Sequence, residues 1–280
     1  MGNTMRTMDV NECPIFVSSA DSYSDIWEPF FAIFKREWPE YRGTIYLNTQ
    51  ERTFELSGLK IVCTNVGKMK CFGETFLSGV AKIPCNHFLL LMIDYFFEGR
   101  VNVRVLQDIY SDFLYGQPDS IQLMPHPYKY VCPVGKTGLC SRILPPGGLK
   151  CAWFSFQAAF WDRASIIKYI RSWESPWTAE YFGTKRAEIL NANIWTCSAR
   201  PIPYDAAGVL YGGGKWNRKA LQKIDFTGVP CLNCSQREEF VQSQSFIKVQ
   251  RVKRLLSGCV YKSLWDIARL RFCKTSKEIR

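Results

Sequence analysis

The chain has 280 residues, of which 47% are hydrophobic and 15% aromatic, a composition that excludes a disordered protein and suffices for a large buried core. Its net charge is +11, from 36 Lys and Arg against 25 Asp and Glu. An excess of this size suits an anionic partner, such as a nucleotide diphosphate, an acidic membrane surface or nucleic acid.

The positive charge is concentrated near the C-terminus. Residues 248–280 hold ten Lys and Arg against two acids, so eight of the eleven net charges lie there. We predict a basic helical tail over residues 246–280, for which two interpretations stay open. It rests on an anionic membrane surface, or it is a solvated helix packed on the body of the protein. We expect no nucleic-acid partner, because such a protein would interleave basic and aromatic residues on its main sheet.

The cysteines and the apolar segments indicate in which cellular compartment the protein is found. The twelve cysteines have no repeated spacing, which favours reduced, mostly buried thiols over a disulfide framework. Residues 1–12 lack the apolar segment of a signal peptide, and the longest apolar run, 88–93, is too short to span a bilayer. We therefore expect a cytoplasmic protein, held at most peripherally on the inner face of the membrane.

Short apolar strands alternate with amphipathic helices over the first 125 residues. The first strand, 14–18, leads through a polar turn into a helix that Ser24 or Asp25 caps and that ends near Pro39. The strand at 87–93 is apolar throughout, which is typical of a strand buried on both faces. The alternation predicts an α/β fold with a Rossmann-like mixed sheet flanked by helices. The other elements expected here are strands at 44–48, 59–63 and 120–124 and helices at 72–83 and 103–115.

The second part of the chain is less regular. Its Pro- and Gly-rich start, 125–148, predicts a long loop or a hairpin insertion. We then expect a strand at 149–156 and helices at 161–170 and 178–191, the last opening after an N-cap and a proline.

Polar residues follow two of the predicted strands. Ligands of open α/β sheets bind outside the carboxyl ends of the strands, which here carry Ser18, Ser19, Asp21 and Tyr23 after the first strand. Asp94 follows the apolar strand, where a charge is poorly solvated unless a divalent metal or a set of donors compensates it. That Asp94 only caps the following turn is an equally open interpretation.

A second acid lies among tryptophans. Glu180 sits near the start of a predicted helix, where the helix dipole favours an acid even without a function. On the functional interpretation, Glu180 is a general base and the aromatic rings stack on sugar rings. The tryptophans concerned are Trp153, Trp161, Trp173 and Trp177.

Several other site types find no support. The Gly-rich loop around Lys215 lacks the spacing of a Walker loop, and no G-x-G-x-x-G follows the first strand. Neither His87 nor His126 is accompanied by a G-x-S-x-G elbow. Lys215 itself either meets a diphosphate or belongs to a solvated turn.

Five sequence blocks follow one another in a specific order, including LLMIDYFF at 90–97 and SPWTAE at 175–180. In this order they resemble the A-type-fold glycosyltransferases encoded in bacterial capsule and surface-polysaccharide loci, over about residues 14–220. The blocks are residues 16–31, 45–48, 90–97, 155–161 and 175–186, and residues 214–216 close the pattern.

The resemblance implies an A-type glycosyltransferase domain over residues 13–245, with a donor half at about 13–124 and an acceptor half at about 149–220. Such an enzyme moves a sugar from a nucleotide-sugar donor to a carbohydrate or lipid-linked acceptor in surface-polysaccharide synthesis. The implied roles are Glu180 and Asp94 as catalytic residues, Ser18, Ser19, Asp21, Tyr23 and Lys215 at the donor, and Trp153, Gln157 and Trp177 at the acceptor.

The sequence departs from this family at the acidic motif. The family carries two adjacent acids there, whereas Ile93 precedes Asp94 in this chain. Mg²⁺ or Mn²⁺ at Asp94 is one expectation; a metal-independent mechanism, with Lys215 or Arg186 offsetting the diphosphate charge, is the other. The alternative function is a non-catalytic carbohydrate- or nucleotide-binding protein on the same fold.

Overall fold

The computed structural model describes residues 8–125, 130–144, 153–211, 214–229 and 237–241. The chain divides into two compact units, residues 1–238 and 239–280, and the sheet and helices below belong to the first. The predicted helical tail over 246–280 lies outside the described residues. None of the helices in the described ranges combines the length and apolarity needed to cross a membrane.

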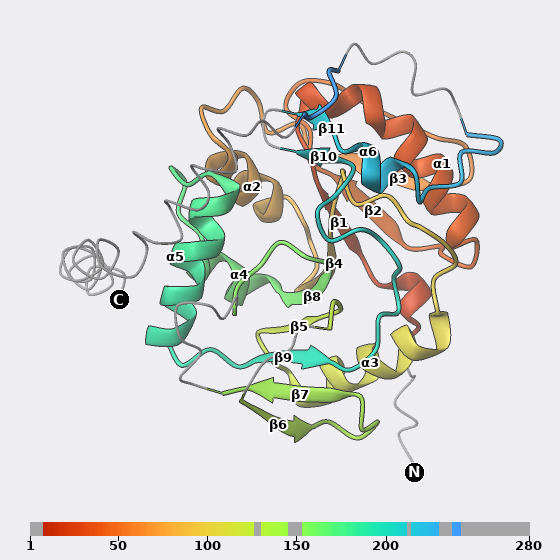
Figure 1. The fold of residues 1–280 in the computed structure, drawn as a ribbon. Helices are drawn as coiled ribbons and strands as arrows, with labels where there is room; N and C mark the ends of the chain where they lie inside the picture. Colours follow the sequence, from red (N-terminus) through yellow and green to blue (C-terminus); the bar gives the residue numbers. More distant parts are fainter. Residues whose placement is uncertain (1–7, 126–129, 145–152, 212–213, 230–236, 242–280) are drawn as a thin grey trace. The chain divides into compact units, whose positions relative to one another are not determined.

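Strands and helices alternate through the first unit (Figure 1). The strands are β1 (Ile15–Ser18), β2 (Thr44–Leu47), β3 (Lys60–Cys63), β4 (His87–Met92), β5 (Ser120–Gln122), β6 (Val131–Val134), β7 (Cys140–Ile143), β8 (Ala159–Asp162), β9 (Ile194–Cys197), β10 (Leu210–Tyr211) and β11 (Lys215–Trp216). The helices are α1 (Trp27–Glu37), α2 (Phe72–Ala81), α3 (Val103–Gly116), α4 (Arg163–Tyr169), α5 (Pro176–Ile189) and α6 (Arg218–Leu221), with 3-10 turns η1 (Val10–Glu12) and η2 (Asp21–Ile26).

Nine strands form one mixed sheet in the order β3-β2-β1-β4-β8-β5-β9-β7-β6. Strands β3, β2, β1 and β4 are parallel, and Ser18 at the end of β1 is level with Met92 at the end of β4. From β1 the chain proceeds outward to β2 and β3 and then returns to place β4 on the other side of β1. The strand order therefore reverses between β1 and β4, which is where open α/β sheets hold their ligands.

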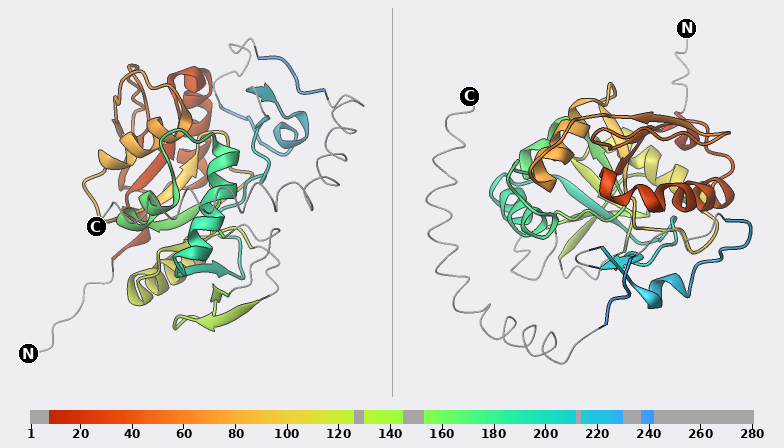
Figure 2. Two further views of the ribbon diagram at one scale, coloured as in Figure 1. Left: turned by 90° about the vertical axis from the view of Figure 1, so that its left-hand side faces the viewer. Right: turned by 90° about the horizontal axis from the view of Figure 1, so that it is seen from above.

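Helices cover both faces of the sheet, as the views of Figures 1 and 2 show. Side chains alternate along each strand, so Ile15 of β1 faces the cluster formed with α1 and α3. Phe16 faces the opposite cluster, formed with α2, α4 and α5. Because both faces are covered, β1 and β4 are apolar almost throughout, as the sequence predicted for residues 87–93.

The predicted strands and helices of the first 125 residues are confirmed, with bounds shifted by one or two residues at most ends. One detail there was wrong. Residues 21–26 form the 3-10 turn η2 ahead of α1, so neither Ser24 nor Asp25 caps the helix with its side chain. The Pro-rich segment contains a hairpin, β6–β7, which agrees with one of the two predicted alternatives.

The second part of the chain differs from the predicted elements at two places. The expected strand at 149–156 is not formed by its described residues, 153–156, which are irregular, and the helix expected from residue 161 begins only at Arg163. Residues 159–162 instead form β8, inserted antiparallel between β4 and β5. Phe160 and Trp161 are both fully buried on opposite faces, which a strand between two neighbours allows and a surface helix does not.

The start of α5 matches its prediction and is held by a buried ion pair. Ser175 and Thr178 form a reciprocal capping box, with proline at the first helical position. Just before it, the Glu174 carboxylate accepts hydrogen bonds of 2.6 and 2.7 Å from Nη2 of Arg186, which also donates to the Tyr169 carbonyl. Both charged side chains are buried, so each depends on the other for its solvation.

Replacing Arg186 by alanine is expected to lower the free energy of unfolding by about 3–5 kcal/mol, because Glu174 would remain buried and unpaired. Arg42→Ala is the matched control, since Arg42 pairs with two acids while more than half exposed, and it should change stability little. Urea denaturation measures both, and equal losses in the two variants would contradict this account.

Candidate active site

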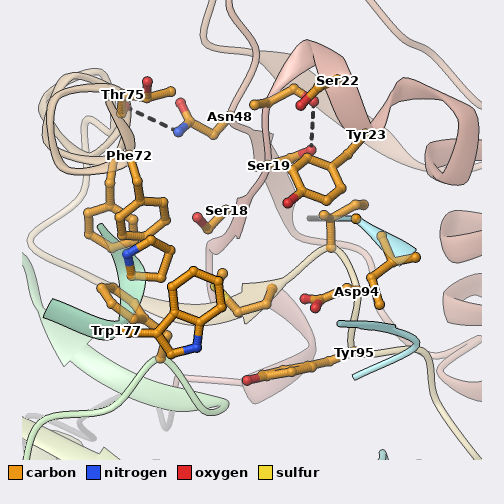
Figure 3. Close-up of a pocket in the computed structure, with 18 of the residues that line it drawn as sticks. Ser18, Ser19, Ser22, Tyr23, Asn48, Phe72, Thr75, Asp94, Tyr95 and Trp177 are labelled. Carbon is orange, nitrogen blue, oxygen red and sulfur yellow. Dashed lines mark hydrogen bonds between the residues drawn. The ribbon is translucent and has the colours of Figure 1, made fainter. Parts of the chain in front are cut away.

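A cavity of about 810 Å³ opens at the carboxyl ends of β1 and β4, at the reversal of strand order. Figure 3 shows Ser18 at the end of β1, Ser19 just beyond it, Asp94 beyond β4, and two walls facing each other across the space. Tyr23 and Asp94 belong to one wall, and Phe72 and Trp177 belong to the other. The cavity thus joins the two regions that the sequence assigned to donor and acceptor.

The loop after β1 forms part of the first wall. The Ser19 hydroxyl accepts a hydrogen bond from the Trp27 indole at 2.8 Å, which fixes the turn into η2. Tyr23, from η2, exposes its ring to the cavity. Asp21 is not among the lining residues.

Asp21 serves instead as an anchor for the loop after β2. Its carboxylate accepts backbone hydrogen bonds from Gln50, Glu51 and Arg52 at 2.8–3.0 Å. Burial raises the pKa of Asp21, but these three bonds outweigh burial and leave the pKa below its usual value. The side chain therefore holds two loops together beside the cavity.

The Asp94 carboxylate is poorly solvated. Burial raises its pKa to about 7, and only its own backbone N–H opposes the shift. Gly208 lies directly against it, at a φ of +70°, and a Cβ there would come within 2.7 Å of Oδ2. The nearby backbone is fixed by the Val209 N–H, which donates to the Asp94 carbonyl at 2.7 Å.

Glu180 projects from the first turns of α5 into the same cavity. Its Oε1 accepts a hydrogen bond from the backbone N–H of Phe156 at 2.8 Å. Burial raises the pKa of Glu180 even though this bond lowers it. Trp177, one turn earlier on α5, also lines the cavity and is 66% exposed, so its ring is available to a ligand.

The other predicted acceptor residues are placed differently. Gln157 lines the cavity, but its amide is bonded within the protein. Trp153 is 1% exposed and Trp161 is fully buried, so both belong to the core, while Trp173 is exposed outside the lining. Of the four tryptophans, Trp177 alone lines this cavity.

The cations at the cavity are not those that the sequence suggested. Lys215 lies outside the lining and pairs with Glu238 at 2.7 Å, and Arg186 is buried against Glu174. Among the residues that the structure describes, the lining cations are Lys70, which is exposed just before α2, and Arg237.

Arg237 stabilises the cavity wall that contains Tyr23. Its guanidinium donates to both carboxylate oxygens of Asp25 at 2.6 Å and to the carbonyls of Ser22 and Gly214. It also lies over the Tyr23 ring, 5.2 Å from the centroid. Sequence reasoning missed it because Arg237 and Asp25 are more than 200 residues apart and no local motif marks either.

The acidic groups permit only a sparse metal site. No three His, Cys, Asp or Glu side chains gather at one point within the described residues. Ile93, which precedes Asp94, is buried and apolar, so it adds no second acid to the site. Mg²⁺ is often held by one carboxylate together with substrate phosphates, and Asp94 fits that minimal role.

Comparisons with known proteins give weak likenesses. No protein-family model matches the chain, and neither does any curated protein. Among solved structures, S. aureus TarS 1–349 gives a TM-score of 0.42 at 13% identity, over 69% of this chain and 59% of its own. The bifunctional IspDF from Campylobacter jejuni gives a TM-score of 0.38 at 7% identity, over 76% of this chain and 54% of its own. UDP-glucose pyrophosphorylase complexed with UDP-glucose gives a TM-score of 0.39 at 11% identity, over 69% of this chain and 91% of its own.

The chain therefore spans less than two thirds of the length of the first two proteins. Likeness at this level carries no activity, substrate or partner over to this chain. The fold class is assigned from the topology of this chain, which is a nine-stranded sheet with helices on both faces. This agrees with the mixed sheet flanked by helices that the sequence predicted.

Titration of Asp94 should be visible in the stability of the protein. A carboxyl group whose pKa is raised in the folded state binds its proton more tightly there, so stability falls as pH rises from about 4 to about 7. Asp94→Asn removes this pH dependence. The free energy of unfolding of the variant, taken relative to the wild type, should therefore rise by on the order of 2 kcal/mol from pH 5 to pH 8. Denaturation at both pH values measures the difference; a constant difference would contradict the raised pKa.

Proposed function

We propose that this protein is a glycosyltransferase that moves a sugar from a nucleotide-sugar donor to a carbohydrate or lipid-linked acceptor. The observation that carries the proposal is that Asp94 and Glu180 line one cavity at the strand-order reversal, with Trp177 exposed beside Glu180. The cavity volume of about 810 Å³ lies in the range of known pockets for small molecules and cofactors, and so suits a nucleotide sugar.

On the donor side, the loop from Ser18 to Tyr23 would hold the nucleoside and the diphosphate would extend past Asp94. Lys70 supports this assignment, because it lines the cavity and no ion pair engages it among the described residues. It takes the role proposed for Lys215 from the sequence. Mg²⁺ or Mn²⁺, if the enzyme uses one, would be held by Asp94 together with diphosphate oxygens and would neutralise their charge.

On the acceptor side, Glu180 would act as the general base. The acceptor hydroxyl oxygen bonds to the anomeric carbon, the bond from that carbon to the diphosphate oxygen breaks, and its electron pair leaves with the nucleoside diphosphate. The hydroxyl proton goes to Glu180, whose raised pKa makes it a better proton acceptor than an ordinary carboxylate. Trp177 and Phe72 offer apolar ring surface for a sugar.

The sequence resemblance supports the wider setting of the proposal, which is surface-polysaccharide synthesis with a donor half near 13–124 and an acceptor half near 149–220. In this setting the basic tail over 246–280 would rest on the anionic inner face of a membrane, where lipid-linked acceptors lie.

Glu180→Gln should lower transfer about 100-fold or more with binding of the nucleotide sugar unchanged, because only the proton acceptor is lost. Transfer is measured with UDP-, GDP- and CMP-sugars and a panel of sugar acceptors, with and without Mn²⁺. Glu28→Gln, on exposed α1 surface outside the cavity, is the matched control and should keep wild-type turnover.

Wild-type turnover in the Glu180→Gln variant would remove Glu180 as the base. Binding of a nucleotide sugar without transfer by the unaltered protein would point to the non-catalytic alternative, which the apolar Ile93 in place of an acid favours.

A further inference from the structure

The side-chain amide of Gln157 is fully occupied within the protein. Its Nε2 donates to the Tyr95 hydroxyl oxygen at 3.0 Å and to the carbonyl of Ala206 at 3.1 Å. Its Oε1 accepts from the Tyr204 hydroxyl at 3.1 Å. Both amide hydrogens and the carbonyl oxygen of Gln157 therefore have partners within the protein, so the amide does not need a ligand to satisfy its hydrogen bonds.

Only one orientation of this amide satisfies its neighbours. Exchanging the nitrogen and oxygen of Gln157 would place its Oε1 against the Ala206 carbonyl, and two acceptors cannot bond to each other. The Tyr204 hydroxyl supports the same orientation from the other side. It accepts from the backbone N–H of Ala158 at 2.9 Å, so its own proton is free for Gln157.

This orientation determines the role of the Tyr95 hydroxyl. Because its oxygen accepts from Gln157, the phenolic proton must point elsewhere, and within the described residues no other hydrogen bond of this hydroxyl is found. The ring is fixed by stacking on Tyr204, with centroids 4.9 Å apart and planes inclined by 15°. Tyr95 lines the cavity, and Figure 3 shows its hydroxyl end directed toward Trp177 across the space.

A tyrosine hydroxyl is an uncharged O–H donor near neutral pH. Tyr95 lines the same cavity as Asp94 and Glu180. A neutral donor can face an anionic oxygen that either carboxylate alone would repel.

We propose that the Tyr95 hydroxyl donates a hydrogen bond to an oxygen of the β-phosphate of the nucleoside diphosphate, and that Gln157 is the positioning residue that directs it there. This inference rests on the proposed function. Negative charge grows on that oxygen as the bond to the sugar breaks, so a donor fixed before the reaction stabilises the departing group. Gln157 thereby acts through Tyr95 and not on the acceptor.

Nucleotide titration of the full-length protein tests the hydroxyl. Calorimetry with UDP, GDP and CDP, and with the corresponding monophosphates, gives the affinity due to the β-phosphate. Tyr95→Phe should weaken diphosphate binding about tenfold or more, the effect of losing a hydrogen bond to a charged group, and leave monophosphate binding unchanged. Tyr169→Phe is the matched control, since its hydroxyl donates to Asp119 outside the cavity, and it should bind as the wild type does.

A double-mutant cycle tests the positioning role. Gln157→Leu should weaken diphosphate binding through Tyr95, so adding it to Tyr95→Phe should cause little further loss. Additive losses would overturn the role of Gln157. Unchanged diphosphate affinity in Tyr95→Phe would overturn the whole inference while leaving the glycosyltransferase proposal intact. If the wild type binds none of the diphosphates, both fail together.

Discussion

The parallel pairing of β1 with β4 is the constraint on which the site depends. Both strands are buried on both faces, so their register cannot slip without moving apolar side chains into the wrong cluster. With Ser18 level with Met92, the chain leaves both strands at the same end of the sheet, where the strand order reverses. The cavity lies at this end and is lined by Ser19 from the loop after β1 and by Asp94 from the loop after β4.

The opposite wall depends on a second fixed element, the corner that begins α5. The buried pair of Glu174 and Arg186 holds this corner, and the Glu174 carbonyl accepts from the backbone N–H of Gly73 at the start of α2. Trp177 and Glu180 are carried on the turns that follow. The two acids therefore face one space because two rigid elements meet there, and that space desolvates both and raises the pKa of each.

Local patterns predicted the parts of this arrangement that local physics determines. The apolar run at 87–93 predicted a central strand, and the Ser175-Pro176 pair predicted the start of α5, because burial and capping leave marks in adjacent residues. Trp161 was assigned to a helix because its pairing partners in β4 and β5 lie about 40–75 residues away. Arg237 and the bonds of Gln157 were missed for the same reason, since their partners come together only in the folded chain.

A crystal structure of the protein with a bound nucleoside diphosphate would show whether this cavity is the nucleotide site. We expect the nucleoside to lie against Ser19 and Tyr23 and the diphosphate to lie within hydrogen-bonding reach of Tyr95, in the cavity that Asp94 and Glu180 share. A nucleotide bound outside this cavity, or one whose phosphates point away from Asp94 and Glu180, would contradict this expectation.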